Sequence, residues 1–70
     1  MNDKNGFMIS NRDRVFKAWL DCTELVRDWQ DYAQELSEDD KELAKLFAEY
    51  SESEALQASK LLEILQGYDR

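Results

Sequence analysis

The chain has no histidine, and this absence removes much of the chemistry on which small enzymes depend. Without an imidazole there is no Ser-His-Asp or Cys-His arrangement, and the commonest transition-metal ligand is missing. Cys22 is the only cysteine, so the chain contains neither an internal disulfide nor a Cys-x-x-Cys zinc pair. Its two glycines, Gly6 and Gly67, do not make a glycine-rich phosphate loop. We therefore expect a protein that is not an enzyme and carries no cofactor.

Long apolar runs and a basic charge balance are also missing. No stretch approaches the roughly 18 consecutive apolar residues of a membrane span. Residues 1–6 are polar and lack the apolar centre of a signal peptide. A net charge of −7, from 16 acidic and 9 basic residues, disfavours contact with nucleic-acid backbones and anionic lipid. Together with the lone cysteine, these features predict a cytoplasmic protein whose partners are neither nucleic acid nor membrane.

The first half of the chain has the periodicity of an amphipathic helix. No glycine or proline occurs between Ser10 and Ser37, and apolar residues recur at alternating steps of four and three, which is a heptad pattern. This first stripe consists of Val15, Trp19, Cys22, Val26, Trp29, Ala33 and Leu36. Ser10 is the expected N-cap, with Asp13 three residues later in a short form of the capping box. We predict an N-terminal tail over residues 1–9 and a helix over residues 10–36.

A second helix is predicted after a short polar break. Ser37 is the expected N-cap, and the three acidic residues that follow it suit the positive end of a helix dipole. Gly67 offers a left-handed C-cap. We place a turn at residues 37–39 and a helix over residues 38–66, and so short a connection makes the two helices an all-α antiparallel hairpin. The stripe of the second helix consists of Leu43, Phe47, Tyr50, Glu54, Gln57, Leu61, Ile64 and Tyr68.

Both stripes are broader than one partner helix can cover. A monomeric hairpin would leave a large apolar patch in water, and a chain of 70 residues rarely gains more than about 3–5 kcal/mol from a single core. Two hairpins packed face to face as a four-helix bundle would bury the excess. We therefore expect a homodimer, and possible contact with a further protein partner. The expected oligomer interface consists of Trp19, Cys22, Val26, Trp29, Phe47, Tyr50, Glu54, Gln57 and Leu61.

Glu54 and Gln57 put polar groups inside the apolar stripe of the second helix, and a buried carboxylate is costly unless it is paired. Several interpretations stay open. In one, the Glu54 carboxylate reaches solvent or a neighbouring Lys or Arg along its aliphatic stem. In another, it belongs to a polar layer that fixes the register of the bundle. That layer would consist of Glu54, Gln57, Ser51 and either Cys22 or Thr23. A metal or a small organic ligand is the remaining interpretation.

A hairpin also determines which residues face this polar position. With the turn near residue 38, Cys22 and Trp19 should lie across from the Glu54 and Gln57 pair. Cys22 is expected to be a packed, buried thiol, because a redox role needs exposure and a lowered pKa. Trp19 and Trp29 are expected in the core, with ligand stacking as the alternative.

Residues 46–65, which read LFAEYSESEALQASKLLEIL, resemble a helix of the rubrerythrin branch of the ferritin-like superfamily. Phe47 matches the aromatic residue of that helix, Glu54 matches its metal-ligating glutamate, and Gln57 stands where the family has histidine. The resemblance implies a four-helix scaffold that has lost most of its metal ligands, with Glu54 as the one candidate ligand. We therefore predict a non-enzymatic scaffold that acts through homo-oligomerisation and protein–protein association. The alternatives are a rubrerythrin-like metal protein with a reduced carboxylate site, and an acidic regulator that binds a basic protein surface.

Overall fold

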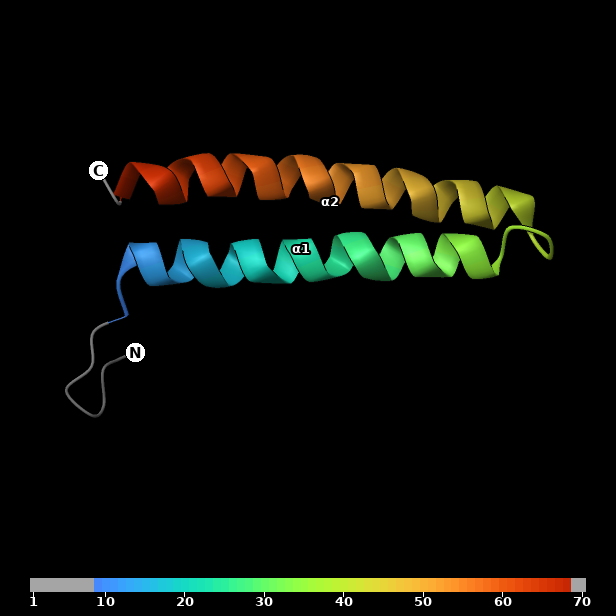
Figure 1. The fold of residues 1–70 in the computed structure, drawn as a ribbon, viewed down its shortest axis with the longest axis horizontal. Helices are drawn as coiled ribbons and strands as arrows, with labels where there is room; N and C mark the ends of the chain where they lie inside the picture. Colours follow the sequence, from blue (N-terminus) through green and yellow to red (C-terminus); the bar gives the residue numbers. More distant parts are fainter. Residues whose placement is uncertain (1–8, 69–70) are drawn as a thin grey trace.

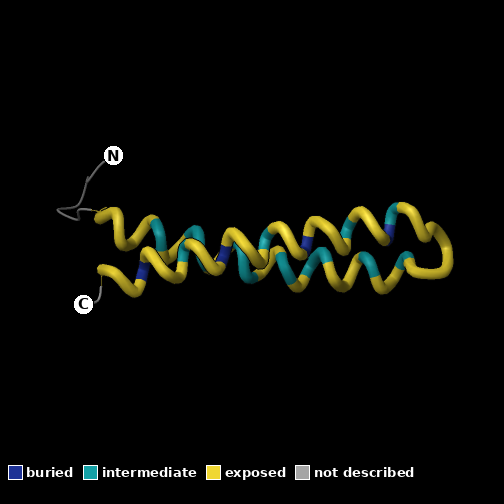
Figure 2. The backbone as a smooth tube through the Cα atoms, turned by 90° about the horizontal axis from the view of Figure 1, so that it is seen from above, coloured by how far each residue is buried: buried dark blue, intermediate teal, exposed yellow. Residues whose placement is uncertain are grey.

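The computed structural model describes residues 9–68, and in this range the chain is a hairpin of two long α-helices (Figure 1). Helix α1 spans Asn11–Glu35 and helix α2 spans Lys41–Tyr68. The helices run antiparallel and side by side, with the turn at one end of the hairpin (Figure 1, Figure 2). The start of α1 and the end of α2 lie together at the other end. The predicted all-α antiparallel hairpin is confirmed.

The start of α1 is the capping box that the sequence predicted. Ser10 has an extended backbone, with φ −80° and ψ 166°, and its Oγ accepts a hydrogen bond from the Asp13 N–H at 3.1 Å. In return the Asp13 carboxylate accepts from the Ser10 N–H at 3.2 Å. Two backbone donors that the helix itself cannot satisfy are thereby paired. Of the predicted tail, residues 1–8 lie outside the described range, and Ile9 is exposed.

The turn differs from the prediction. The chain continues to turn after α1, and the Asp40 N–H donates to the Leu36 carbonyl at 2.9 Å. Asp40 then caps the second helix, since its Oδ1 accepts from the Leu43 N–H at 3.1 Å. The prediction of Ser37 as N-cap is wrong, and α2 begins three residues later than expected. Asp and Ser are about equally good caps, so position in the turn rather than residue type selects Asp40.

The end of α2 differs as well. The helix continues through Gly67 to Tyr68, beyond the predicted end at residue 66. Gly67 does not adopt the left-handed conformation, and a Cβ added there would meet nothing within 4 Å. The predicted glycine C-cap is therefore wrong, and Gly67 is an ordinary helical residue with open space beside it.

The contact line between the helices is formed by small side chains on α2. Four residues at intervals of seven are the buried residues of the described range, and Figure 2 shows them evenly spaced along α2. They are Ala44, Ser51, Ala58 and Leu65. On α1, every member of the predicted stripe, from Val15 to Leu36, is half-buried. Because three of the four buried side chains are small, α1 can lie close against this column of α2.

The predicted α2 stripe is consequently displaced. The members of this stripe lie beside the buried column and do not form it. The small side chains of the column let α1 approach the column more closely than it approaches the stripe. The half-buried members are Leu43, Phe47, Glu54 and Leu61, and the exposed members are Tyr50, Gln57, Ile64 and Tyr68. The prediction that Gln57 faces the packing partner of its own hairpin is therefore wrong.

The hairpin has a thin hydrophobic core. No large side chain of the described residues is fully buried, and the buried apolar residues are only Ala44, Ala58 and Leu65. Folded domains normally bury several large aliphatic or aromatic side chains completely, each worth about 1.5–3 kcal/mol. Most of the apolar surface in this hairpin therefore lies at its edges, partly in contact with water.

Candidate functional site

The middle of the hairpin carries a polar pair that joins the two helices. Cys22 of α1 lies across from Glu54 of α2, close enough for the Glu54 carboxylate to raise the pKa of the Cys22 thiol. The predicted juxtaposition of these two residues is confirmed. Burial, the charge and hydrogen bond of Glu54, and the charge of Asp21 together raise the pKa of the Cys22 thiol above its ordinary value of 9.0. Cys22 is therefore a protonated thiol at neutral pH, which does not favour a redox role.

A second polar contact lies one helical turn from this pair. The Ser51 side chain is 4% exposed, and its hydroxyl donates to the Val26 carbonyl of α1 at 3.0 Å. A side chain can bond the backbone of a neighbouring helix only when the two helices are close, so this contact marks a point of close approach. Ser51, Cys22 and Glu54 together form the part of the predicted polar layer that the structure brings together.

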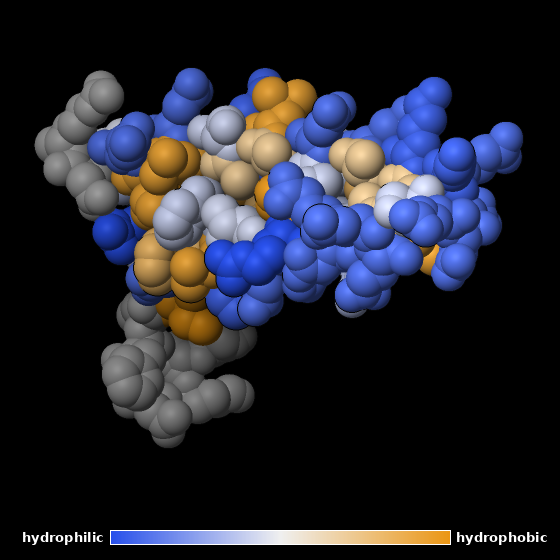
Figure 3. Space-filling view, turned by 45° about the vertical axis from the view of Figure 1, so that its right-hand side comes forward, coloured by the Kyte–Doolittle hydropathy of each residue, from blue (hydrophilic) through white to orange (hydrophobic). Residues whose placement is uncertain are grey.

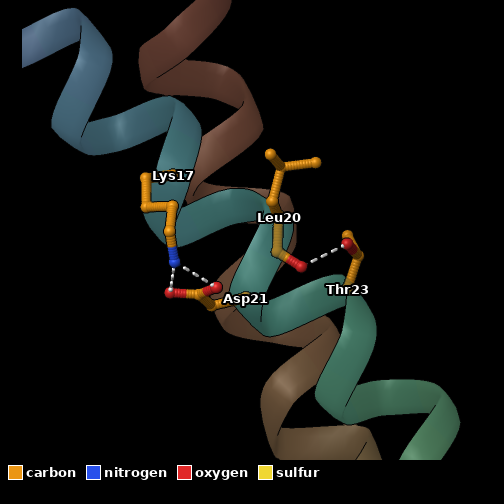
Figure 4. A network of polar contacts seen from close by, with 4 residues as sticks. All are labelled: Lys17, Leu20, Asp21 and Thr23. Carbon is orange, nitrogen blue, oxygen red and sulfur yellow. Dashed lines mark hydrogen bonds and ion pairs between the residues drawn. The ribbon is translucent and has the colours of Figure 1, made fainter.

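The other two candidates for that layer lie elsewhere. Gln57 is exposed on the flank of α2. Thr23 is half-buried, and its Oγ1 donates to the Leu20 carbonyl within α1 at 2.8 Å (Figure 4). This local bond uses the Thr23 hydroxyl inside its own helix. The polar layer is therefore smaller than the sequence suggested.

Four aromatic rings from both helices gather in the half of the hairpin nearest the turn. The ring centroid of Trp29 lies 5.2 Å from that of Phe47, 5.3 Å from that of Tyr50 and 6.1 Å from that of Tyr32. These separations are typical of favourable aromatic pairs. Phe47 and Trp29 are half-buried, whereas Tyr32 and Tyr50 are 46% and 43% exposed. The two tyrosines thus form the outer, water-facing layer of the cluster.

The cluster contains one unpaired polar atom. Trp29 Nε1 is shielded from solvent and has no hydrogen-bond partner among the described residues. An unmade hydrogen bond of this kind costs about 1–3 kcal/mol. Ring packing with three neighbours offsets that cost, so Trp29 acts here as a packing residue.

Large apolar side chains remain exposed along both helices. Eleven of them are at least 36% exposed among the described residues. They are Ile9, Phe16, Leu20, Leu25, Tyr32, Leu46, Tyr50, Leu56, Leu62, Ile64 and Tyr68. On the face drawn in Figure 3, hydrophobic side chains gather toward the end that carries the start of α1, and the turn end is mainly hydrophilic. Exposed apolar surface of more than a few hundred Å² is uncommon on a monomeric soluble protein.

An exposed ion pair lies on the surface of α1. Lys17 Nζ lies 2.7 Å from Asp21 Oδ1, and the two side chains are 70% and 54% exposed (Figure 4). This pair borders a depression of about 370 Å³, which Glu24 and Arg27 also line. An exposed pair one helical turn apart contributes only about 0.3–0.5 kcal/mol. The depression is lined mainly by exposed charged side chains of α1.

No metal cluster forms around Glu54. Among residues 9–68, no group of three or more His, Cys, Asp or Glu side chains lies close enough to hold a metal ion. Of these side chains, Cys22 lies close to Glu54. Of the described helices, neither is both long and apolar enough to cross a membrane.

Comparisons with models of protein families, with curated proteins and with solved structures found no match to this chain. The resemblance of residues 46–65 to the rubrerythrin branch of the ferritin-like superfamily therefore remains a prediction from the residues alone.

Proposed function

We propose that this chain is a small non-enzymatic association module, in which two hairpins pair as a four-helix bundle and act through protein–protein contact. One observation carries the proposal: within residues 9–68 no large side chain is fully buried, while eleven large apolar side chains are substantially exposed. A monomer with so few buried and so many exposed apolar side chains gains little stability from its core, because most of its apolar surface stays in water. Pairing with a second copy supplies the missing cover.

The residues proposed for the interface retain surface for such pairing. Seven of them line the seam between the helices and are only half-buried there: Trp19, Cys22, Val26, Trp29, Phe47, Glu54 and Leu61. Tyr50 and Gln57 are exposed on the flank of α2. A residue that is half covered by its own hairpin can be covered completely by another, which is how helices of a bundle share one core.

Two chemical features support a role without catalysis. The sequence has no histidine, and the thiol of Cys22 has a raised pKa, so no activated nucleophile is apparent in the seam. With a lone cysteine and a net charge of −7, the cytoplasm is the compartment we propose for this association.

Sedimentation equilibrium on the purified chain, combined with metal analysis of the same sample, tests this function. We expect twice the chain mass of 8.3 kDa and no bound metal. A folded monomer would contradict the proposal. Iron bound in proportion to the chain, with a rise in thermal stability, would instead support the metal-binding alternative, because binding to the folded state must stabilise it.

A further inference from the structure

Six of the exposed apolar side chains lie on one face of the hairpin, which we call the tyrosine face. It consists of Leu25, Tyr32, Leu46, Tyr50, Ile64 and Tyr68. On α2, Leu46 precedes Tyr50 by about one turn, and Tyr68 follows it by 18 residues, which is about five turns. On α1, Leu25 precedes Tyr32 by about two turns. Each helix therefore presents its members along one side.

Ring contacts show that the two rows share the same face. The Tyr32 ring lies 6.1 Å from Phe47, and the Tyr50 ring lies 6.3 Å from the same Phe47 and 5.3 Å from Trp29. The two tyrosines, one from each helix, thus flank the same pair of rings. The remaining exposed apolar side chains, such as Leu20 and Leu56, project from other sides of the helices at 42% and 62% exposure.

The area of the tyrosine face is appropriate for a dimer. Its members are 37% to 50% exposed. With total areas of about 150–250 Å² for large side chains, the six offer roughly 400–600 Å² of apolar surface per copy. A stable interface buries about 800 Å² per partner, with an apolar centre and a polar rim. The face supplies the apolar centre of such an interface.

Charge is distributed unevenly along the hairpin. Residues 31–40, at the turn, carry five acidic side chains and no basic one. Residues 11–20, at the opposite end, carry three basic side chains and one acidic one. Side-by-side pairing with both turns together would place ten acidic groups at one end of the bundle.

We infer that two copies pair through their tyrosine faces in opposite directions, so that the acidic turn of each lies beside the basic start of α1 in the other. The inference rests on the proposed self-association and adds the face and the direction of pairing. Opposite charges then meet at both ends, which favours this direction over the parallel one. The tyrosines near each turn pack on Ile64 and Tyr68 of the other copy.

Distances between spin labels test the direction. A label on Ser37→Cys in a Cys22→Ala background reports the separation of the two turns within the dimer. Opposite pairing places them about 38 Å apart or more, the length of a 25-residue helix. A separation below about 20 Å, two packed helix diameters, would overturn the direction. A label on Glu24→Cys, near mid-hairpin, serves as the control and gives a short distance in either arrangement.

A matched pair of variants tests the face. Ile64→Glu puts a charge on the tyrosine face, and Leu56→Glu puts the same charge on another side of α2 at a similarly exposed position. We expect Ile64→Glu to raise the dimer Kd at least tenfold, and Leu56→Glu to change it less than threefold. Because the separated hairpin can unfold, Kd is measured from the helical signal on dilution, starting from a concentration at which both variants are helical.

The outcomes separate this inference from the proposed function. If the parent chain is monomeric, the proposed function fails together with the inference. If the parent is dimeric but both glutamate variants weaken it equally, or only Leu56→Glu does, the face is wrong while the association stands. A dimer with short turn-to-turn distances leaves the association intact and refutes the opposite pairing.

Discussion

At the residue scale, the smallest side chains decide how the hairpin packs. Ala44, Ser51 and Ala58 recur at intervals of seven and form most of the buried column of α2. Ser51 adds a hydrogen bond from its hydroxyl to the Val26 carbonyl at 3.0 Å. The close approach of the helices requires a small side chain at residue 51, and the hydrogen bond requires a polar one. Because the packing is tight, we expect stability to depend more on the size of this side chain than on its polarity.

Substitution of Ser51 tests this order of importance. Ser51→Ala keeps the close approach and loses one hydrogen bond, for a loss of about 0.5–1.5 kcal/mol in the free energy of unfolding. Ser51→Leu must push the helices apart, which costs about 1–3 kcal/mol. Ser53→Leu, at an exposed position two residues later, is the size-matched control and should change stability by less than about 0.5 kcal/mol. Urea denaturation measures all three, and equal effects of the two leucines would contradict the account.

The Cys22 thiol provides a test of the contact with Glu54. Because its pKa is raised above the ordinary value of 9.0, alkylation by iodoacetamide should be slow at neutral pH and should rise at higher pH than for a free thiol. Glu54→Gln removes the carboxylate charge but not the burial, and should lower the thiol pKa part of the way to its ordinary value. Glu52→Gln, at an exposed position, is the control and should leave the rate profile unchanged.

The raised pKa of Cys22 also determines how the stability of the fold changes with pH. A thiol whose pKa is higher in the folded chain than in the unfolded chain loses its proton first in the unfolded chain. Its contribution to stability is therefore complete below about pH 9 and declines as the pH rises through the folded-state pKa. Stability that increases over this alkaline range because of Cys22 would contradict the Cys22–Glu54 contact.

Individual site residues could be predicted in part. Counting outward from a turn near residue 38 placed Cys22 across from Glu54, because an antiparallel hairpin fixes that alignment. The same count did not show that Gln57 is exposed. Two adjacent rows of residues run along α2, one that contains Gln57 and one that contains Ala58. Both rows repeat every seven residues, so the heptad pattern does not show which of them faces α1. The choice between them depends on side-chain volume at the contact, which apolar periodicity does not contain.

At the element scale, each helix end depends on which side chain meets the free backbone groups. The capping box of Ser10 and Asp13 could be predicted because its two residues are only three positions apart in the sequence. The start of α2 was not, because Ser37 and Asp40 are equally acceptable caps and the path of the turn selects between them. Helix ends in general are the least certain part of a sequence-based assignment.

Alanine variants distinguish the two candidate caps of α2. Asp40→Ala removes the acceptor of the Leu43 N–H and should cost about 1 kcal/mol in the free energy of unfolding. Ser37→Ala lies in the turn and should change it by less than about 0.5 kcal/mol. Thermal or urea unfolding measures both, and a larger loss for Ser37→Ala would mean that α2 begins where the sequence first suggested.

Substitution of Gly67 distinguishes a helical glycine from a left-handed C-cap, because the change in stability has the opposite sign in the two cases. In the helix, with open space beside it, Gly67→Ala should stabilise the chain by up to about 1 kcal/mol. At a left-handed C-cap the same substitution would destabilise it by about 1–2 kcal/mol. The melting temperature of the variant decides between them, with Gln66→Ala as the neighbouring control.

At the scale of the whole molecule, the hairpin is an incomplete core. The all-α architecture and the antiparallel pairing followed from heptad periodicity and a short connection, and the structure confirms both. The extent of exposure also followed, because two broad stripes cannot cover each other. Periodicity within one chain does not specify the face or the direction in which we propose that a second copy covers that surface.

The dependence of unfolding on protein concentration shows whether two copies of the chain share one core. If two copies share one core, folding and association are a single equilibrium, and the melting temperature of the parent chain must fall as the protein is diluted. We expect a clear, continuous decrease over about a hundredfold dilution, with loss of helical signal at the lowest concentrations. A helical chain whose melting temperature stays the same across that range would be a stable monomer and would contradict the account.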